Sequence, residues 1–427
     1  MTKRALYNHA VLKRMTTLRF FLLISCFSFL SVLWFTSVNR EESIIQEALD
    51  NIARDIRYSN VYRKPSRQPK DLKYVLLWTR QDYSPFYFLG NGQRAFLKNN
   101  CSVYNCYVTT NRDFFGGDTS RFDAIAFNGR NLRPMRRSQL PKKRSIHQKY
   151  IFFNLESADN YPICHSMFEG FFNWTATYKL DSDVPFPYIV VKNRNGEIVG
   201  PKKKMEWVSN MRDVDKDFAV QLMSKKKAAA WFVSSCSDRS GRREFVTKLQ
   251  GALAGYGLTV DVYGACGTMK CPLEKKSECD SMLERDYYFY LSLENSFAED
   301  YVTEKLLTAL QHNTVPIVYG AADYSRFLPP GSYLDARKQD ADDLAAKISH
   351  LIATPDLYHQ FFKWKHYYSY HDATDSDNVC AICEALNNKS KVETTTSYTD
   401  FRRWWNPLYK ERCWWLEDDI GFDHLLP

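Results

Sequence analysis

The hydrophobic positions in the first half of the chain fall into short runs that are separated by polar segments. Four of these runs read YVLLW, CYVTT, FDAIAF and YIFFNLE, and they begin at Tyr74, Cys106, Phe122 and Tyr150. Runs of four to eight apolar, β-branched and aromatic residues are typical of buried strands. We therefore expect a series of strands in this half of the chain.

The second half alternates more regularly between strand-like and helix-like patterns. Such alternation predicts a mostly parallel sheet with helices on its faces. A polar segment at 195–217, with two glycines and a proline, separates the two halves and marks a domain boundary. The expected strands are 228–235, 258–264, 287–294 and 314–320, and the expected helices are 242–257, 301–313, 342–355 and 355–368. The aromatic segment 401–420 is too apolar to lie in solvent, so we expect it to pack against a domain.

The N-terminal pattern predicts a membrane anchor. Residues 20–38 form 19 consecutive positions without a charge, about the length that spans a bilayer as a helix. Basic residues precede this span and Glu41 and Glu42 follow it, so the rest of the chain should lie on the non-cytoplasmic side. We expect a cytoplasmic tail at 1–19, a signal anchor at 20–38 and a stem at 39–70. A cleaved signal peptide is the alternative, but its apolar region is usually shorter.

Cysteine usage agrees with an oxidising compartment. Of 11 cysteines, Cys26 lies in the apolar span and ten follow it, an even number that suggests disulfides. Cys380 and Cys383 form a CxxC, but no second Cys or His pair completes a zinc site. Asn100 and Asn388 begin two of three glycosylation sequons, and the third begins at Asn173. The net charge of +9 is spread along the chain and does not indicate nucleic-acid binding.

Candidate functional residues cluster where the strand-like run at 287–294 meets the helical pattern at 301–313. Ligands of open α/β sheets bind beyond the carboxyl ends of the strands, and a helix N-terminus suits an anion. A purely structural role for these residues is equally open, because acidic residues such as Glu299 and Asp300 are also favoured near the start of a helix. The chain has neither GxxxxGK[ST] nor GxGxxG, which argues against a P-loop or a standard dinucleotide site.

At these residues the chain resembles the α1,3-fucosyltransferases. YLSLENSFAEDYVTEKLLTALQHNTVPIVYG is similar to the donor signature of that family, in which a FENS-like strand end runs into YVTEK. WFVSSCSDRSGRREFVTKLQ, YIFFNLESADNYP and TYKLDSDVPFPY resemble three further family segments. The resemblance implies an α/β fold of the GT-B type, with two facing Rossmann-like domains after a single transmembrane helix. It also implies a single-pass type II protein of the Golgi membrane. Its domains would be an acceptor-side domain at 71–210, a GDP-fucose-binding domain at 211–372 and a disulfide-tied tail at 373–427.

The resemblance also implies roles for individual residues. The family moves L-fucose from GDP-fucose to the 3-hydroxyl of N-acetylglucosamine with inversion, so one displacement requires a carboxylate to take the acceptor proton. Glu156 would be this base. Arg242 would bind the diphosphate. Arg239 and Arg243 are close enough in sequence that either can be the matching residue instead. The further residues that would contact GDP-fucose are Asn295, Tyr301, Glu304 and Lys305.

Several alternatives remain open in the sequence. The DSD at 181–183 suggests a metal-dependent transferase of another nucleotide sugar. The matching family segment carries DSD without depending on it for metal, so we expect no obligate metal site, and stimulation by Mn²⁺ stays open. A glycan-binding protein on a degenerate transferase fold is a further alternative. The acceptor can be the N-glycan core or a LacNAc or LacdiNAc antenna, because FPYIVVKNRNGEIVGPKKKMEW departs from the family pattern. As in some relatives, Cys101 and Cys106 are expected to pair with Cys380 and Cys383, whereas the partners of the other six cysteines stay unassigned.

Overall fold

The computed structural model describes residues 72–374 and 377–414 of the chain. The predicted tail, signal anchor and stem at 1–19, 20–38 and 39–70 lie outside these residues. Within the described ranges, no helix combines the length and the apolar character that a membrane span needs.

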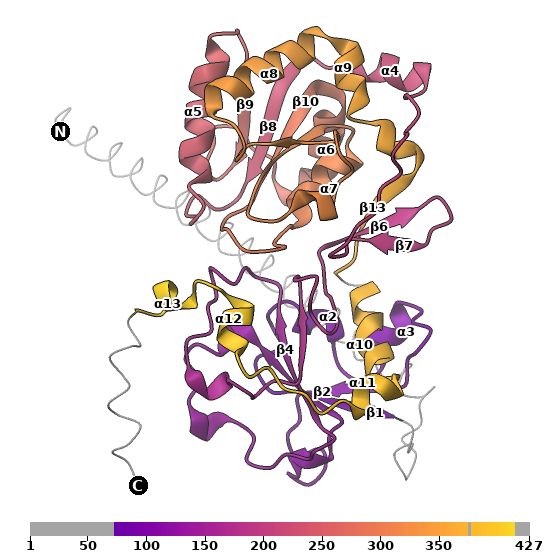
Figure 1. Cartoon of the computed structure of the whole chain (residues 1–427), viewed down its shortest axis with the longest axis vertical. Coiled ribbons are helices and arrows are strands. Elements are labelled where there is room, and N and C mark those ends of the chain that lie inside the picture. The colour runs from indigo at the N-terminus through magenta and orange to yellow at the C-terminus, as the bar shows by residue number, and fades with distance from the viewer. Residues whose placement is uncertain (1–71, 375–376, 415–427) are drawn as a thin grey trace, which may run out of the picture. The chain divides into compact units, whose positions relative to one another are not determined.

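The first of two parallel sheets lies in the N-terminal half (Figure 1). Its five strands run in the order β2-β1-β3-β4-β5, and every neighbouring pair is parallel. The first four strands coincide with the four predicted runs. The bounds are β1 Lys73–Leu77, β2 Cys106–Thr109, β3 Ala124–Asn128, β4 Lys149–Asn154 and β5 Trp174–Thr177.

Both faces of this sheet are covered by apolar side chains. On one face pack the short helices α2 (Phe86–Leu89) and α3 (Arg94–Lys98) together with α10 (Asp377–Asn387) from the C-terminal part of the chain. On the other face, Phe401 and Trp405 of α12 (Phe401–Trp405) join an aromatic cluster that includes Phe152. The start of the aromatic tail is therefore packed against a sheet, as its apolar sequence predicts.

The second parallel sheet lies in the C-terminal half and has the strand order β12-β11-β10-β8-β9. The alternating pattern predicted this sheet, and its α/β character is confirmed. Its bounds are β8 Lys227–Val233, β9 Val260–Gly264, β10 Tyr287–Leu293, β11 Val315–Tyr319 and β12 Leu334–Asp335. The helices that cover its two faces are α5 Arg242–Ala254, α8 Ala341–Ala353 and α9 Pro355–Gln360 on one side, and α6 Lys276–Asp286 and α7 Glu304–Gln311 on the other.

Several elements differ from the sequence-based expectation, and two of them have a clear physical reason. The helix expected over 355–368 ends at Gln360, and the chain continues as a 3-10 turn into β13 (Tyr368–Asp372). β13 pairs antiparallel with β6 (Ile189–Asn193), which in turn pairs with β7 (Ile198–Gly200). Pairing with a strand that is about 180 residues away overrides the local helical pattern here, because it buries Tyr370. The second difference is α6, whose KSECDSMLERD sequence buries only Cys279 and Leu283 and so carries little periodic signal.

Five disulfides use all ten cysteines that follow residue 38. Cys101 bonds to Cys380 and Cys106 to Cys383, which confirms the expected pairing and accounts for both cysteines of the CxxC. These two bonds join the region of α3 and β2 to α10 across about 280 residues of sequence. The pairs that the sequence left unassigned are Cys164–Cys413, Cys236–Cys266 and Cys271–Cys279.

Candidate active site

The polar corner after β10 is built around Glu294. This side chain is buried and directly follows the last residue of the strand. Its carboxylate accepts hydrogen bonds from the backbone N–H and the hydroxyl of Thr303, at 2.9 and 3.0 Å. Burial raises the pKa of Glu294, while Lys305 acts in the opposite direction. Glu294 therefore closes the loop between β10 and α7 and places the start of the helix at the carboxyl edge of the sheet.

Lys305 lies in the first turn of α7 with its ammonium group surrounded by acceptors. Its Nζ donates to Glu294 at 3.1 Å, to Thr303 Oγ1 at 2.7 Å and to Glu304 at 3.3 Å. Burial disfavours the charge of Lys305, but Glu294 and Glu304 outweigh this effect and raise its pKa. An ammonium group has three donors, so all three have protein partners. The contact with Glu304 is the longest, and the Glu304 side chain is 61% exposed, so this contact is the one that a ligand can replace most easily.

Tyr301 connects this corner to the segment that follows β4. Its hydroxyl donates to Glu156 Oε2 at 3.4 Å, and its ring packs edge-on against Tyr178. Tyr301 is 2% exposed, whereas Glu156 is partly exposed. Burial raises the pKa of Tyr301 well above its usual value, so the hydroxyl remains a donor. The structure thus brings Glu156, the predicted base, into contact with Tyr301, which is predicted to contact GDP-fucose.

Asn295 and Ser296 make a second connection with the same segment. The Ser296 hydroxyl is hydrogen-bonded to that of Ser157, and both residues are fully buried. Asn160 donates to the side-chain oxygen of Asn295 at 3.5 Å. The backbone oxygen of Asn295 accepts the N–H of Arg239 at 2.9 Å. Asn295 is therefore at the meeting point of the segments that follow β4, β8 and β10.

The three arginines after β8 occupy different environments. Arg242 is 3% exposed, and its guanidinium donates to the carbonyl oxygens of Leu293 and Ser235, at 2.9 and 3.2 Å. This places its charge at the carboxyl edge of β8 and β10, beneath the surface. Arg239 and Arg243 are exposed, and Arg243 donates to the carbonyl oxygen of Cys236.

Glu299 and Asp300 have a different role from the other residues of the corner. Asp300 is buried with a left-handed backbone (φ 58°), and it accepts hydrogen bonds from Lys203 at 2.8 Å and Arg326 at 2.7 Å. It also accepts the backbone N–H of Leu180 at 3.0 Å. These two carboxylates therefore hold the corner to the chain around 180 and 203, which is a structural role.

The carboxylates of the DSD segment also have protein partners. Asp183 accepts the backbone N–H of Thr175 and the hydroxyl of Tyr398, both at 2.8 Å. Asp181 accepts the indole N–H of Trp404 at 3.2 Å and lies 3.9 Å from Lys203. Over 72–374 and 377–414, no three His, Cys, Asp or Glu side chains come together in a group that can hold a metal ion.

The structure adds residues that sequence reasoning did not select. Thr303 and Ser157 carry hydrogen bonds that shape the corner, and Lys203 belongs to its ion-pair network. Thr303 lies within YVTEK and Ser157 within NLES, so their place in the two quoted segments was the available signal. Lys203 had no such signal, because it sits in a run of three lysines.

Comparisons with known proteins identify the family. The model described as "Fucosyltransferase, N-terminal" matches residues 70–189, and "Glycosyltransferase family 10 (fucosyltransferase) C-term" matches residues 222–404. α-(1,3)-Fucosyltransferase C of Drosophila melanogaster is 37% identical over 308 residues, which cover 71% of this chain and 70% of that protein. Glycoprotein 3-α-L-fucosyltransferase A of the same organism is 31% identical over 74% of this chain and 57% of its own length. α-(1,3)-Fucosyltransferase fut-1 of Caenorhabditis elegans is 38% identical over 169 residues, which cover 37% of this chain and 38% of that protein.

Among solved structures, a crystal structure of α1,3-fucosyltransferase with GDP aligns with 79% of this chain and 95% of its own. The TM-score is 0.46 and the sequence identity 16%. The two family models and the Drosophila relative cover both halves of the described chain. The chain belongs to the fucosyltransferases of glycosyltransferase family 10 and is a glycosyltransferase.

Proposed function

We propose that the protein is an inverting α1,3-fucosyltransferase that moves L-fucose from GDP-fucose to the 3-hydroxyl of N-acetylglucosamine on glycoprotein glycans. The observation that carries the proposal is the 3.4 Å contact between Tyr301 and Glu156, because it brings a free carboxylate edge to the YVTEK corner. The relatives named α-(1,3)-fucosyltransferase support the same reaction.

Glu156 is the proposed general base. In a single displacement, its carboxylate takes the proton from the acceptor hydroxyl as that oxygen forms a bond to the anomeric carbon of fucose. The bond between this carbon and the diphosphate oxygen breaks at the same time, and GDP leaves. Glu156 is partly exposed and its backbone N–H is fixed by the Asn154 side chain at 2.9 Å, which suits a group that must meet substrate in one orientation.

The proposed donor site consists of Asn295, Tyr301, Glu304 and Lys305, with Arg242 behind it. These residues fit a sugar nucleotide chemically, because an ammonium and a guanidinium at the sheet edge offset the charge of a diphosphate. Lys305 can turn one donor to a phosphate oxygen if Glu304 gives up its 3.3 Å contact. Glu304 is then free to accept a hydrogen bond from a hydroxyl group of GDP-fucose. Arg242 stabilises the charge of the diphosphate from beneath the surface, or Arg239 and Arg243 have this role.

The two parallel sheets and the contacts between their carboxyl-end segments support a GT-B arrangement. We also propose that residues 20–38 anchor the protein in the Golgi membrane with the catalytic part in the lumen. Five disulfides support an oxidising compartment. The acceptor is either the N-glycan core or a LacNAc or LacdiNAc antenna.

The test is an assay of the full chain with GDP-fucose and three acceptors: a core N-glycopeptide, LacNAc and LacdiNAc. Each is measured with and without EDTA. We expect transfer to the 3-hydroxyl of N-acetylglucosamine in at least one acceptor, insensitive to EDTA and abolished in Glu156→Gln. Glu197→Gln, an exposed glutamate on the loop between β6 and β7, is the matched control and should keep full activity.

Transfer that requires a divalent ion and depends on Asp181 would contradict the proposal and favour the metal-dependent alternative. Binding of GDP-fucose without transfer to any acceptor would instead favour a glycan-binding protein. Retention of activity in Glu156→Gln would leave the reaction in place and remove Glu156 as its base.

A further inference from the structure

The Cys236–Cys266 disulfide joins two loops at the carboxyl edge of the second sheet. Cys236 follows β8 and Cys266 follows β9, and these two strands are parallel neighbours. Ligands of open α/β sheets bind beyond this edge. Both cysteines are partly exposed. The bond therefore lies at the edge of the sheet that the proposed donor site uses.

The arginine loop, residues 234–241, connects β8 to α5 and has two differently held halves. In its second half, the Ser240 hydroxyl donates to the carbonyl oxygen of Glu294 at 2.7 Å. The backbone N–H of Ser240 also donates to the carbonyl oxygen of Asn295, at 3.2 Å. Hydrogen bonds thus fix this half against the polar corner after β10 without help from the disulfide.

The first half of the arginine loop, residues 234–237, has fewer restraints. Over 72–374 and 377–414, the hydrogen bonds that join it to other segments come from two arginine side chains. Arg242 donates to the carbonyl oxygen of Ser235 at 3.2 Å, and Arg243 donates to that of Cys236 at 3.1 Å. The disulfide is the covalent restraint on this half, so the position of Cys236 depends on it.

The partner of Cys236 lies in a loop that packs tightly onto the strand ends. Ala265 donates its backbone N–H to the carbonyl oxygen of Val233 at 3.1 Å, and Gly264 donates to that of Met269 at 3.0 Å. A Cβ atom on Gly264 would lie 2.3 Å from the Val233 carbonyl oxygen, so the two segments are in close contact. The disulfide thus fastens a weakly held segment to a rigid one.

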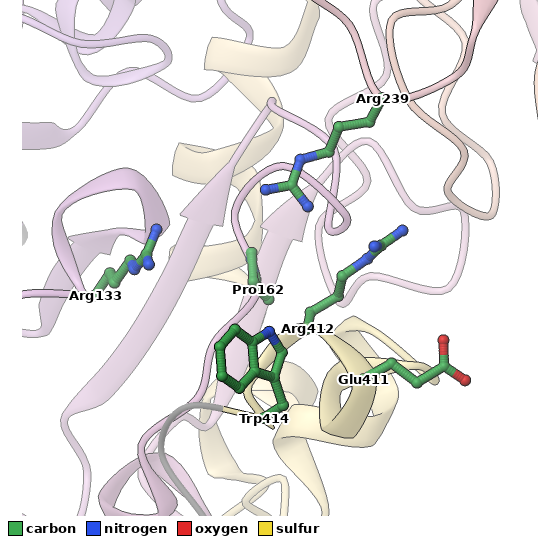
Figure 2. A pocket seen from close by; sticks show the side chains of 6 residues that line it. All are labelled: Arg133, Pro162, Arg239, Glu411, Arg412 and Trp414. Carbon is green, nitrogen blue, oxygen red and sulfur yellow. The ribbon is translucent and has the colours of Figure 1, made fainter.

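Arg239 extends from the arginine loop. Its backbone N–H donates to the carbonyl oxygen of Asn295 at 2.9 Å, but within the part of the chain that the structure describes its guanidinium has no protein acceptor. The side chain is exposed, lines a cavity of about 260 Å³ and points toward Pro162 (Figure 2). Arg242 and Arg243 use donors on loop carbonyls, whereas Arg239 keeps its donors for a ligand. The backbone of the loop alone sets where they point.

We propose that the Cys236–Cys266 disulfide is a positioning element of the donor site, which holds the arginine loop so that Arg239 faces the diphosphate of GDP-fucose. The inference rests on the proposed function, in which arginines after β8 stabilise the charge of this group. A guanidinium binds two phosphate oxygens through a planar fork of donors, so a shift of the loop weakens the contact. Donor affinity therefore depends on the bond, whereas acceptor affinity does not.

The first test removes the bond from the full chain. In a variant that carries Cys236→Ser and Cys266→Ser, we expect the KM for GDP-fucose to rise about tenfold, the effect of one charge-assisted hydrogen bond. GDP should bind about tenfold more weakly in calorimetry, and the KM for the N-acetylglucosamine acceptor should stay the same. The matched control carries Cys271→Ser and Cys279→Ser, which removes another disulfide of the second half, and should keep the donor KM.

A double-mutant cycle determines whether the bond acts through Arg239. Arg239→Gln alone should weaken GDP binding about tenfold, and loss of the bond in this background should weaken it further by less than about twofold. Two independent effects that multiply would contradict the proposed role. Arg403→Gln removes an exposed arginine that is paired with Asp400 and should keep the wild-type affinity for GDP.

The reciprocal effect is measured on the wild type, so it does not depend on the folding of a variant. Dithiothreitol gives two electrons to a disulfide, which becomes two thiols while the dithiothreitol closes to its own cyclic disulfide. Coupling between two sites is reciprocal, so saturating GDP should stabilise the bond by the same factor of about ten. GDP should therefore lower the equilibrium ratio of reduced to oxidised Cys236–Cys266 about tenfold and leave that of Cys271–Cys279 unchanged. Alkylation followed by peptide mapping measures both ratios.

An unchanged GDP affinity in the variant without the bond would overturn the proposal, as would an equal loss in the control variant. A ratio of reduced to oxidised Cys236–Cys266 that GDP does not alter would also overturn it. A wild type that binds no GDP and transfers no fucose would refute the proposed function, and the inference with it. A wild type that transfers fucose with a donor KM independent of the bond would refute the inference alone.

Discussion

The hydroxyl of Tyr301 donates a hydrogen bond to Glu156 Oε2 at 3.4 Å, although the two residues are 145 positions apart. Tyr301 belongs to the corner after β10, and Glu156 follows β4. Because Tyr301 is buried and its pKa is raised well above the usual value, it presents a fixed donor to the carboxylate. This contact makes Tyr301 a positioning residue for the proposed base as well as a candidate contact of the donor.

Replacing Tyr301 with phenylalanine tests this relationship. The variant keeps the ring that packs against Tyr178 but loses the hydroxyl. A hydrogen bond to a charged group contributes about 1.5–3 kcal/mol, so we expect kcat to fall at least about tenfold. The KM for GDP-fucose should change less, because the ring still fills its place. Steady-state kinetics with both substrates provide the two constants.

The control for this variant is Tyr358→Phe. Tyr358 is as deeply buried, and its hydroxyl donates to the carbonyl oxygen of Tyr288 at 2.6 Å on the opposite face of the second sheet from α7. It should lose stability without a specific loss of kcat. Equal losses of kcat in the two variants would show that Tyr301 acts only through stability.

Glu304→Gln tests the exposed side of the proposed donor site. Glu304 is 61% exposed and accepts a hydrogen bond from Lys305 at 3.3 Å. If this carboxylate accepts a hydroxyl of the donor sugar nucleotide, its loss should raise the KM for GDP-fucose about tenfold. Glu278→Gln replaces a glutamate in the first turn of α6 that is 74% exposed, and it should leave KM unchanged. An unaltered KM in Glu304→Gln would remove this residue from the donor site.

The ion pairs of Glu299 predict a pH-dependent part of the stability. Burial acts to raise the pKa of Glu299, but Lys203 and Lys179, at 2.7 and 3.1 Å, outweigh it and lower the pKa from 4.5 to about 2. A carboxyl with a lower pKa in the folded state stabilises the fold above pH about 4.5, and this contribution is lost as the pH falls toward about 2. The side chain is 45% exposed, so solvent screening limits the contribution to about 1 kcal/mol.

We therefore expect Glu299→Gln to be less stable than the wild type at neutral pH by about 1 kcal/mol. The difference should shrink steadily as the pH falls below about 4.5. Urea unfolding at a series of pH values measures it, and Glu278→Gln serves again as the exposed control. A difference that stays constant with pH would mean that the ionised form of Glu299 does not contribute to stability.

Much of the fold could be predicted from local sequence patterns. YVLLW and TVPIVYG are buried on both faces of a parallel sheet, and such strands are nearly continuous apolar runs that a reader can recognise. The proposed donor corner could be located in the sequence because YVTEK lies in one continuous segment. Arg242 shows the limit of this approach. Its motif position indicates a phosphate ligand, but only the structure shows its guanidinium buried on the carbonyl oxygens of Leu293 and Ser235.

Apart from the two disulfides that the family resemblance implied, contacts between distant segments could not be predicted. Lys203 lies between two exposed lysines, yet its ammonium group meets Glu299 and Asp300 because the corner after β10 folds back on it. The same holds for Arg412, which meets Asp159 across 253 residues. A charge run has no period that distinguishes its one partly buried member, so the information lies in the tertiary fold.

The disulfides that join α10 to the first sheet predict the largest loss of stability. Each closes a loop of nearly 280 residues, whereas Cys271–Cys279 spans eight. In the chain-entropy account, a cross-link stabilises by restricting the unfolded chain, and more so for longer loops. Replacing Cys101, Cys106, Cys380 and Cys383 with serine should therefore lower the free energy of unfolding by about 5 kcal/mol, against about 2 kcal/mol for serine at Cys271 and Cys279. Urea unfolding under non-reducing conditions measures both, and peptide mapping verifies the remaining bonds. Equal losses would mean that strain or residual structure, rather than loop closure, decides what these bonds contribute.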